Sequence, residues 1–138
     1  MSYKLGDIIC FKRLMYTHYG VYIGNNNIIH KDRKFRNGSN ARISNINDVN
    51  GIPYIKPDPI YIKSLKLEAY DTYTRHTVVE RAYSMLDDKY YNMFTDNCEH
   101  FVTLIKYNKK ASTQATKLKK IIWLIVVILC TQFIIYLK

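Results

Sequence analysis

The chain has 138 residues, of which 48% are hydrophobic and 23% are charged, and its formal net charge is +10. This length suits one domain, and the composition excludes a disordered or collagen-like chain. The positive charge suits an anionic surface, either nucleic acid or membrane lipid. Cys10, Cys98 and Cys130 have neither a disulfide-framework spacing nor a C-x-x-C spacing, which favours free thiols in a reducing compartment.

The first third of the chain predicts antiparallel strands. Residues 7–11 and 18–23 are rich in β-branched and aromatic residues, as is typical of strands. Turn-forming residues at 24–27 precede Ile28-Ile29-His30, which indicates a hairpin. Cys10 in the first strand is interpreted as a small buried hydrophobic residue.

The middle of the chain is polar and basic. Residues 31–50 predict a solvated loop with a turn at Asn37-Gly38, and the alternative is a loop that binds lipid headgroups. Three prolines break residues 51–62 into extended pieces that fit edge strands or a loop. Residues 61–63 predict one more short strand.

Helical spacing resumes after this region. Apolar residues recur with a helical period from Val78 to Leu86, and Thr77 is a candidate N-cap with Glu80 three residues later. A second helix is predicted over residues 97–107, with the apolar residues on one face.

The far end of the chain predicts a membrane anchor. Residues 121–137 form a run of 17 without a charge, which as a helix spans about 26 Å, near the short limit for a bilayer core. Lys117, Lys119 and Lys120 precede the run, so the positive-inside tendency predicts a single-pass tail anchor with the rest of the chain in the cytosol. A buried core helix is the alternative, but the run is apolar on every face. The expected organisation is a folded domain over 1–108, a basic linker over 109–120 and an anchor over 121–137, without a signal peptide before them.

Cys98 is the strongest candidate for chemistry. Asp96 can cap the helix over 97–107, and Glu99 stands three residues later, as in a capping box. The N–H groups at such a helix start lower a thiol pKa and leave the Cys98 backbone N–H available to an oxyanion. A buried structural cysteine is the alternative that the local pattern leaves open.

His18 and His30 give Cys98 possible partners. The two histidines are twelve residues apart with Gly24 at their midpoint, so a hairpin centred there places them directly across from each other. One imidazole then orients the other, as in a catalytic triad. A tight turn at Asn25-Asn26 would instead place His30 opposite Val21, so a bulge or an odd-length loop is required.

His100 follows Cys98 by two positions, or about 200° around a helix, and is expected to pack or cap rather than act as a base. Cys98 and His100 lack a second ligand pair at zinc spacing, and neither a Gly-rich phosphate loop nor G-x-S-x-G occurs. We therefore expect neither a metal nor an organic cofactor.

The segment Asn97-Cys98-Glu99-His100-Phe101-Val102 resembles the cysteine motif of the lecithin retinol acyltransferase-like proteins. These include the small phospholipase A/acyltransferases, within the NlpC/P60 superfamily. Gly6-Asp7, residues 18–24 and Ile28-Ile29-His30 match the family's N-terminal pattern, including the histidine spacing. The resemblance covers roughly residues 5–107. One departure is Tyr19, where the family usually has Trp.

The resemblance implies an α+β domain of the permuted papain-like type, with an antiparallel sheet packed on helices and a C-terminal hydrophobic anchor. It implies that Cys98 is the nucleophile that forms an acyl-thioester, that His18 is the general base and acid, and that His30 orients His18. The Cys98 backbone N–H, Tyr22 and Tyr19 are the candidates for holding the oxyanion. The histidines precede the cysteine, which argues against peptidoglycan hydrolysis.

The implied activity is that of a membrane-anchored thiol phospholipase A1/A2 and acyltransferase. It would cleave acyl esters of glycerophospholipids at a phospholipid membrane and pass the acyl group to water, an amine or a lysolipid. A thiol protease or amidase on the same residues and a non-catalytic membrane adaptor remain alternatives. Nucleic-acid binding is permitted by the charge, but the aromatic residues form no recognised platform.

Overall fold

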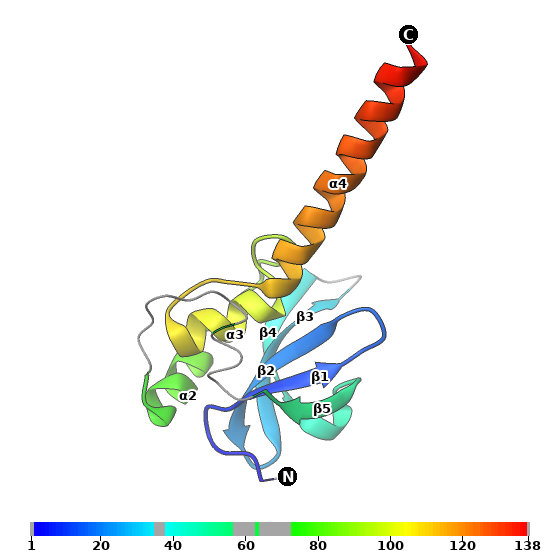
Figure 1. Ribbon diagram of the computed structural model, residues 1–138. Coiled ribbons are helices and arrows are strands. Elements are labelled where there is room, and N and C mark those ends of the chain that lie inside the picture. The colour runs from blue at the N-terminus through cyan, green and yellow to red at the C-terminus, as the bar shows by residue number, and fades with distance from the viewer. Residues whose placement is uncertain (1, 35–37, 57–62, 64–72, 138) are drawn as a thin grey trace.

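Figure 1 shows the computed structural model of the chain, which describes residues 2–34, 38–56, 63 and 73–137. Its antiparallel sheet has the strand order β4-β3-β2-β1-β5. The strands are β1 Ile8–Lys12, β2 Thr17–Gly24, β3 Asn27–Lys34, β4 Gly38–Asn45 and β5 Ile52–Ile55. The short 3-10 helix η1 Ile46–Asp48 precedes β5, and α2 Arg75–Ser84, α3 Cys98–Tyr107 and α4 Thr113–Tyr136 follow. The predicted α+β class is confirmed.

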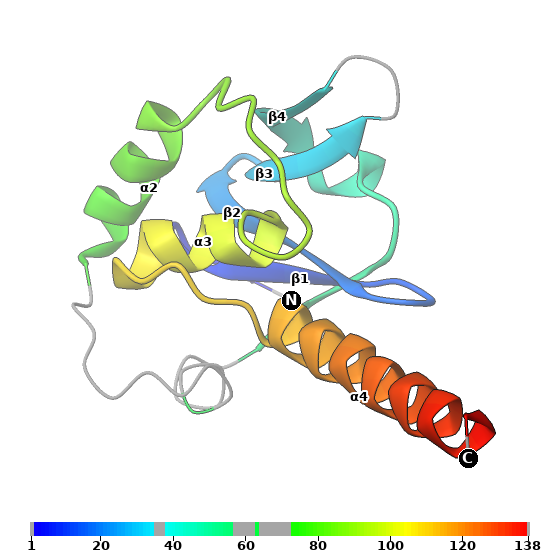
Figure 2. The same ribbon diagram turned by 90° about the horizontal axis from the view of Figure 1, so that it is seen from above.

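The sheet carries an apolar core on each face. On one face Val21 and Ile29 pack with Phe101 of α3 and Val78 of α2, and Figure 2 shows both helices on this side. On the other face the core is formed by Ile9, Phe11, Ile28, Ile46 and Val49. Most strand positions near the centre of the sheet are therefore buried whichever way their side chains point.

The expectation of a solvated loop over residues 31–50 is wrong, because most of this stretch belongs to β3, β4 and η1. The pairing of β3 with β4 runs from Asn27 opposite Asn45 to Lys34 opposite Gly38. Lys31 is fully buried, and its Nζ lies 2.6 Å from Asp88 and 3.2 Å from Asp96. Lys31, which the sequence predicts to be solvent-exposed, thus forms buried ion pairs with two aspartates.

The edge strand β5 agrees with the prolines, since Pro53 lies opposite Phe11 at the border of the sheet. The short strand predicted over residues 61–63 falls largely outside the described residues. The α2 helix begins earlier than predicted, because Thr74 and not Thr77 is its N-cap. The Thr74 side chain accepts the Thr77 N–H at 3.2 Å.

The α4 helix projects from the domain (Figure 1). In the described part of the chain it is the one helix long and apolar enough to cross a membrane, with a mean hydropathy of 2.2 over a window that is 0% buried. It begins at Thr113 and continues without a break into the apolar run. Lys117, Lys119 and Lys120 are exposed on its first turns.

Candidate active site

Cys98 is the first residue of α3, and Asn97 caps that helix. The Asn97 side chain accepts the backbone N–H groups of Glu99 and His100 at 2.9 and 3.1 Å. The His100 Nδ1 accepts the Asn97 N–H at 3.3 Å, which completes a capping box. The predicted capping role of His100 is thus confirmed, whereas the predicted pairing of Asp96 with Glu99 in that role is wrong.

The histidines come together through a β-bulge. Asn25 and Asn26 have φ values of 49° and 58°, as in a tight hairpin turn. That turn alone would place His30 opposite Val21, but the register shifts by one residue between Tyr22 and Gly24. His30 therefore lies opposite Gly20 and on the same face as His18.

The predicted direct pairing of the two histidines across the hairpin is therefore wrong, because His30 and His18 are diagonal neighbours. Diagonal side chains lie within reach of each other when they are long or aromatic. His18 Nε2 and His30 Nδ1 are 2.7 Å apart and the rings meet edge to face. Gly20 keeps this space open, since a Cβ there would lie 3.2 Å from the His30 Cβ.

Ser44 of β4 extends the pair into a chain of hydrogen bonds. Its Oγ lies 2.9 Å from His30 Nε2. When His30 Nε2–H donates a hydrogen bond to the Ser44 hydroxyl, His30 Nδ1 has a lone pair that accepts a hydrogen bond from His18 Nε2–H. In that arrangement the remaining nitrogen, His18 Nδ1, carries a lone pair and can act as a base. Sequence reasoning missed Ser44, because it lies in the stretch interpreted as a loop.

The Cys98 thiol lies where the β2–β3 ladder ends. The Tyr22 backbone N–H and C=O bond to Asp7 and Gly6, on the β1 side. Because these groups alternate along a strand, those of Tyr19 face β3. The pairing with β3 stops at Gly20, and the Tyr19 N–H donates to the Cys98 thiol instead. The sulfur is thus held by the residue that follows His18.

The protonation states differ from the expectation of an acidic thiol. Burial raises the pKa of Cys98 to about 12, although the Tyr19 N–H acts in the opposite direction. The rise in the thiol pKa caused by desolvation is larger than the fall caused by the helix N-terminus, because Cys98 is only 2% exposed. Burial lowers the pKa of His30 to about 4, and burial together with His30 holds the pKa of His18 well below its usual range. At neutral pH the site holds a thiol and neutral imidazoles.

The thiol and the histidines share their charged surroundings. After burial, Arg13 and Asp32 are among the causes that shift the pKa of both Cys98 and His30. Arg42 lies opposite His30 and its Nη2 is 3.2 Å from Asp32. Arg13 and Asp32 thus influence both groups, although the histidine side chains share the sheet face of Phe11 and Ile28 and Cys98 belongs to the core on the opposite face. In the described ranges, no three His, Cys, Asp or Glu side chains are grouped to hold a metal ion.

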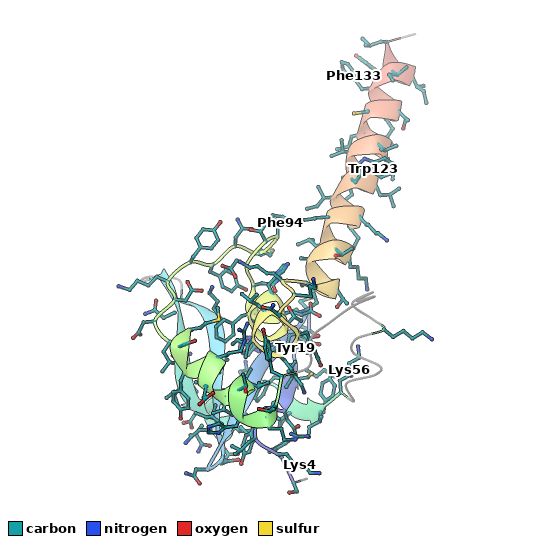
Figure 3. All side chains as sticks on the ribbon, turned by 90° about the vertical axis from the view of Figure 1, so that its left-hand side faces the viewer. Lys4, Tyr19, Lys56, Phe94, Trp123 and Phe133 are labelled. Carbon is teal, nitrogen blue, oxygen red and sulfur yellow. The ribbon has the colours of Figure 1, made fainter. Side chains whose placement is uncertain are left out.

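The two tyrosine candidates lie in different places. Tyr22 is at the far end of β2, where its hydroxyl accepts the Asn26 N–H at 3.3 Å, so the structure does not bring it to Cys98. Tyr19 is 5% exposed in the core cluster that contains Cys98, and Figure 3 shows it beside α3. Burial, followed by Glu99, raises the pKa of Tyr19, so the phenol keeps its proton.

Comparison with known proteins gives consistent results. The family model for lecithin retinol acyltransferase matches residues 1–111. Lecithin retinol acyltransferase of Bos taurus is 28% identical over 141 residues, which cover 84% of this chain and 60% of that protein. Phospholipase A and acyltransferase 2 of Homo sapiens is 24% identical over 123 residues, covering 82% and 76%. Phospholipase A and acyltransferase 4 of Homo sapiens is 28% identical over 131 residues, covering 84% and 77%. The chain thus spans about 60% of the length of the lecithin retinol acyltransferases that it matches.

Proposed function

Because this chain belongs to the lecithin retinol acyltransferase family, we propose that it is a membrane-anchored phospholipase A1/A2 and acyltransferase whose nucleophile is Cys98. The observation that carries the proposal is the buried His18–His30 pair, joined at 2.7 Å, beside the strand edge that holds the Cys98 thiol. Family members named for acyltransferase and phospholipase activity support the reaction class. The histidines precede the cysteine along the chain, which fits the permuted papain-like order.

The proposed reaction begins from a neutral thiol and a neutral imidazole. His18 Nδ1 takes the thiol proton as the sulfur attacks the acyl carbonyl of a glycerophospholipid. The tetrahedral intermediate collapses, the ester C–O bond breaks, and His18 returns the proton to the lysolipid oxygen. The acyl group is then bound to Cys98 as a thioester. Water, an amine or the hydroxyl of a lysolipid next attacks the thioester, with His18 again as the base.

The Cys98 backbone N–H is the first candidate for holding the oxyanion. The Asn97 cap occupies the N–H groups of Glu99 and His100 and does not take that of Cys98. A first-turn N–H has no partner within its helix, so it is suited to a developing negative charge. The Tyr19 N–H, which faces the same sulfur, is the second candidate.

The membrane side of the proposal rests on α4 and on exposed apolar residues. Leu14 and Met15 are 98% and 88% exposed in the β1–β2 connection that leads to His18. Figure 3 shows Phe94 at the end of the domain from which α4 leaves, whereas Lys4 lies at the opposite end. We place this end at the bilayer. The exposed lysines at the start of α4 favour a cytosolic domain.

The decisive experiment looks for the acyl-enzyme. The full chain is incubated with phospholipid vesicles and its peptides are analysed by mass spectrometry. We expect an acyl adduct on Cys98 and release of lysolipid, both absent from Cys98→Ala. Cys130→Ala is the matched control, because Cys130 is an exposed thiol in α4 and its removal leaves the adduct intact.

Absence of both adduct and lysolipid, with vesicle-bound protein, would contradict the proposal. Turnover of a peptide amide by the wild type but not by Cys98→Ala, without lipid turnover, would identify a thiol protease or amidase instead.

A further inference from the structure

The first turn of α4 contacts the residue that follows Cys98. We call Ser112, Thr113 and Gln114 the α4 root. The hydroxyls of Ser112 and Thr113 donate to the Glu99 carboxylate at 2.6 and 2.8 Å, and the Gln114 backbone N–H donates to it at 3.1 Å. Glu99 is 0% exposed, so these donors replace the water that a carboxylate otherwise requires.

The α4 root also contacts the residue that precedes His18. The Gln114 side-chain oxygen accepts the Thr17 N–H at 2.8 Å, and its Nε2 donates to the Thr17 carbonyl at 2.9 Å. The backbone N–H and C=O of Thr17 face the side of β2 on which β3 pairs further along, beyond the end of that pairing at Gly20. The Gln114 amide therefore pairs with Thr17 as a neighbouring strand would.

These contacts join the two proposed catalytic residues through a third element. Cys98 lies on α3 and His18 on β2, and the α4 root is hydrogen-bonded to Glu99, which follows Cys98, and to Thr17, which precedes His18. The root is continuous with the helix that projects from the domain (Figure 1). A rigid helix transmits a change in its tilt to its first turn.

We propose that the α4 root is a clamp that sets the position of Cys98 relative to His18, with Gln114 as a positioning residue. The proposal rests on the proposed function, which supplies the roles of Cys98 and His18. The membrane helix is then part of the catalytic apparatus as well as an anchor. A displacement of about 1 Å between reacting groups can cost on the order of 100-fold in rate, so the clamp controls turnover.

The test compares Gln114→Ala with Gln132→Ala in the full chain held in detergent micelles. Gln132 has the same side chain and lies exposed in the same helix, far from the domain. The substrate is a short-chain phosphatidylcholine below its critical micelle concentration, so that tethering to a bilayer contributes nothing. We expect Gln114→Ala to lower kcat about tenfold or more while KM changes less than about twofold, and Gln132→Ala to have no effect.

A second measurement separates the clamp from the chemistry. Single-turnover mass spectrometry follows formation of the Cys98 acyl adduct, and added hydroxylamine then removes the acyl group without help from His18. The clamp predicts slower acylation in Gln114→Ala and unchanged removal by hydroxylamine. If the wild type forms neither an adduct on Cys98 nor lysolipid, the proposed function fails; if Gln114→Ala acylates at the wild-type rate, only the clamp fails.

A near-isosteric variant covers the case in which Gln114→Ala does not fold. Gln114→Glu keeps the acceptor for the Thr17 N–H and loses the donor to the Thr17 carbonyl. We expect it to keep the thermal unfolding transition and to lose about threefold to tenfold in acylation rate, the worth of roughly one hydrogen bond. Wild-type acylation in a folded Gln114→Glu, or an equal loss in Gln132→Ala, would overturn the clamp.

Discussion

Replacing Lys31 by Met tests whether a buried ion pair holds the β3–β4 hairpin against the rest of the domain. The Lys31 side chain is 0% exposed and lies between Asp88 and Asp96, whose side chains are 32% and 8% exposed. Methionine has a similar length and removes the ammonium group, with its charge and its hydrogen bonds to Asp88 and Asp96. The substitution therefore leaves two carboxylates that had faced a cation.

The expected loss can be bounded from these contacts. Breaking a buried ion pair by removing one partner typically costs about 3–5 kcal/mol. Asp96 keeps a second cation, since Lys110 lies 3.2 Å from it, and Asp88 is exposed enough to be hydrated. Both effects reduce the penalty, so we expect the free energy of unfolding to fall by about 3 kcal/mol.

Urea unfolding of the full chain in a mild detergent measures this loss. Circular dichroism is the suitable probe, because the single tryptophan, Trp123, lies in α4 and does not report on the domain. Lys12→Met is the matched control, since Lys12 is an exposed lysine on β1 and its loss should cost less than about 0.5 kcal/mol.

A loss below about 1 kcal/mol for Lys31→Met would refute this reasoning, because it would mean that the pair contributes no more than a surface salt bridge. Adding Asp96→Asn to Lys31→Met should recover part of the loss, because it removes one of the carboxylates left without Lys31.

Three further predictions concern the histidines. Ser44→Ala should lower kcat about tenfold and alter the pH–rate profile, because His30 loses the partner that selects its tautomer, and Ser44→Thr should restore both. The pKa of His30 is about 4 in the folded chain and near 6.5 when unfolded, so the unfolded state binds the proton first as the pH falls. Stability should be full above pH 6.5 and fall by about 3 kcal/mol between pH 6.5 and 4, and unfolding of His30→Asn should lack this component. Gly20→Ala should cost about 1–3 kcal/mol in thermal unfolding and reduce turnover, because its Cβ would lie 2.6 Å from the Ile28 Cδ1 and crowd His30. A Gly20→Ala variant as stable and as active as the wild type would contradict the packing described around the histidines.

The sequence allowed prediction of the parts of the fold that have a local signal. Stretches rich in β-branched and aromatic residues gave β1, β2 and the start of β3, and a charge-free run gave the helix that can cross a membrane. The β4 strand was not predicted because the interactions that stabilise it are not local in the sequence. Its neighbour Lys31 is stabilised by Asp88 and Asp96, which are 57 and 65 residues away, and no periodicity within residues 31–50 reveals them.

The candidate site shows the same limit. The need for a bulge between the histidines followed from strand geometry, because side chains alternate from face to face. The raised pKa of Cys98 could not be predicted from the sequence, because the sequence shows the start of the helix but not how deeply the thiol is buried. Gln114 and Ser44 were missed because each contacts a backbone group or a ring that only the folded chain brings near.

The bulge in the β2–β3 hairpin has a consequence for how this chain tolerates change. Ile28 and Ile29 are both fully buried, on opposite faces, so exchanging their faces would leave an equally apolar core. The sheet face on which the His30 side chain lies is therefore set by the number of residues between Gly20 and Asn27, and not by hydrophobic burial. Substitutions that keep the length and the turn conformation should therefore preserve the histidine pair, whereas deletion of a single residue there should leave a folded hairpin with His30 on the wrong face.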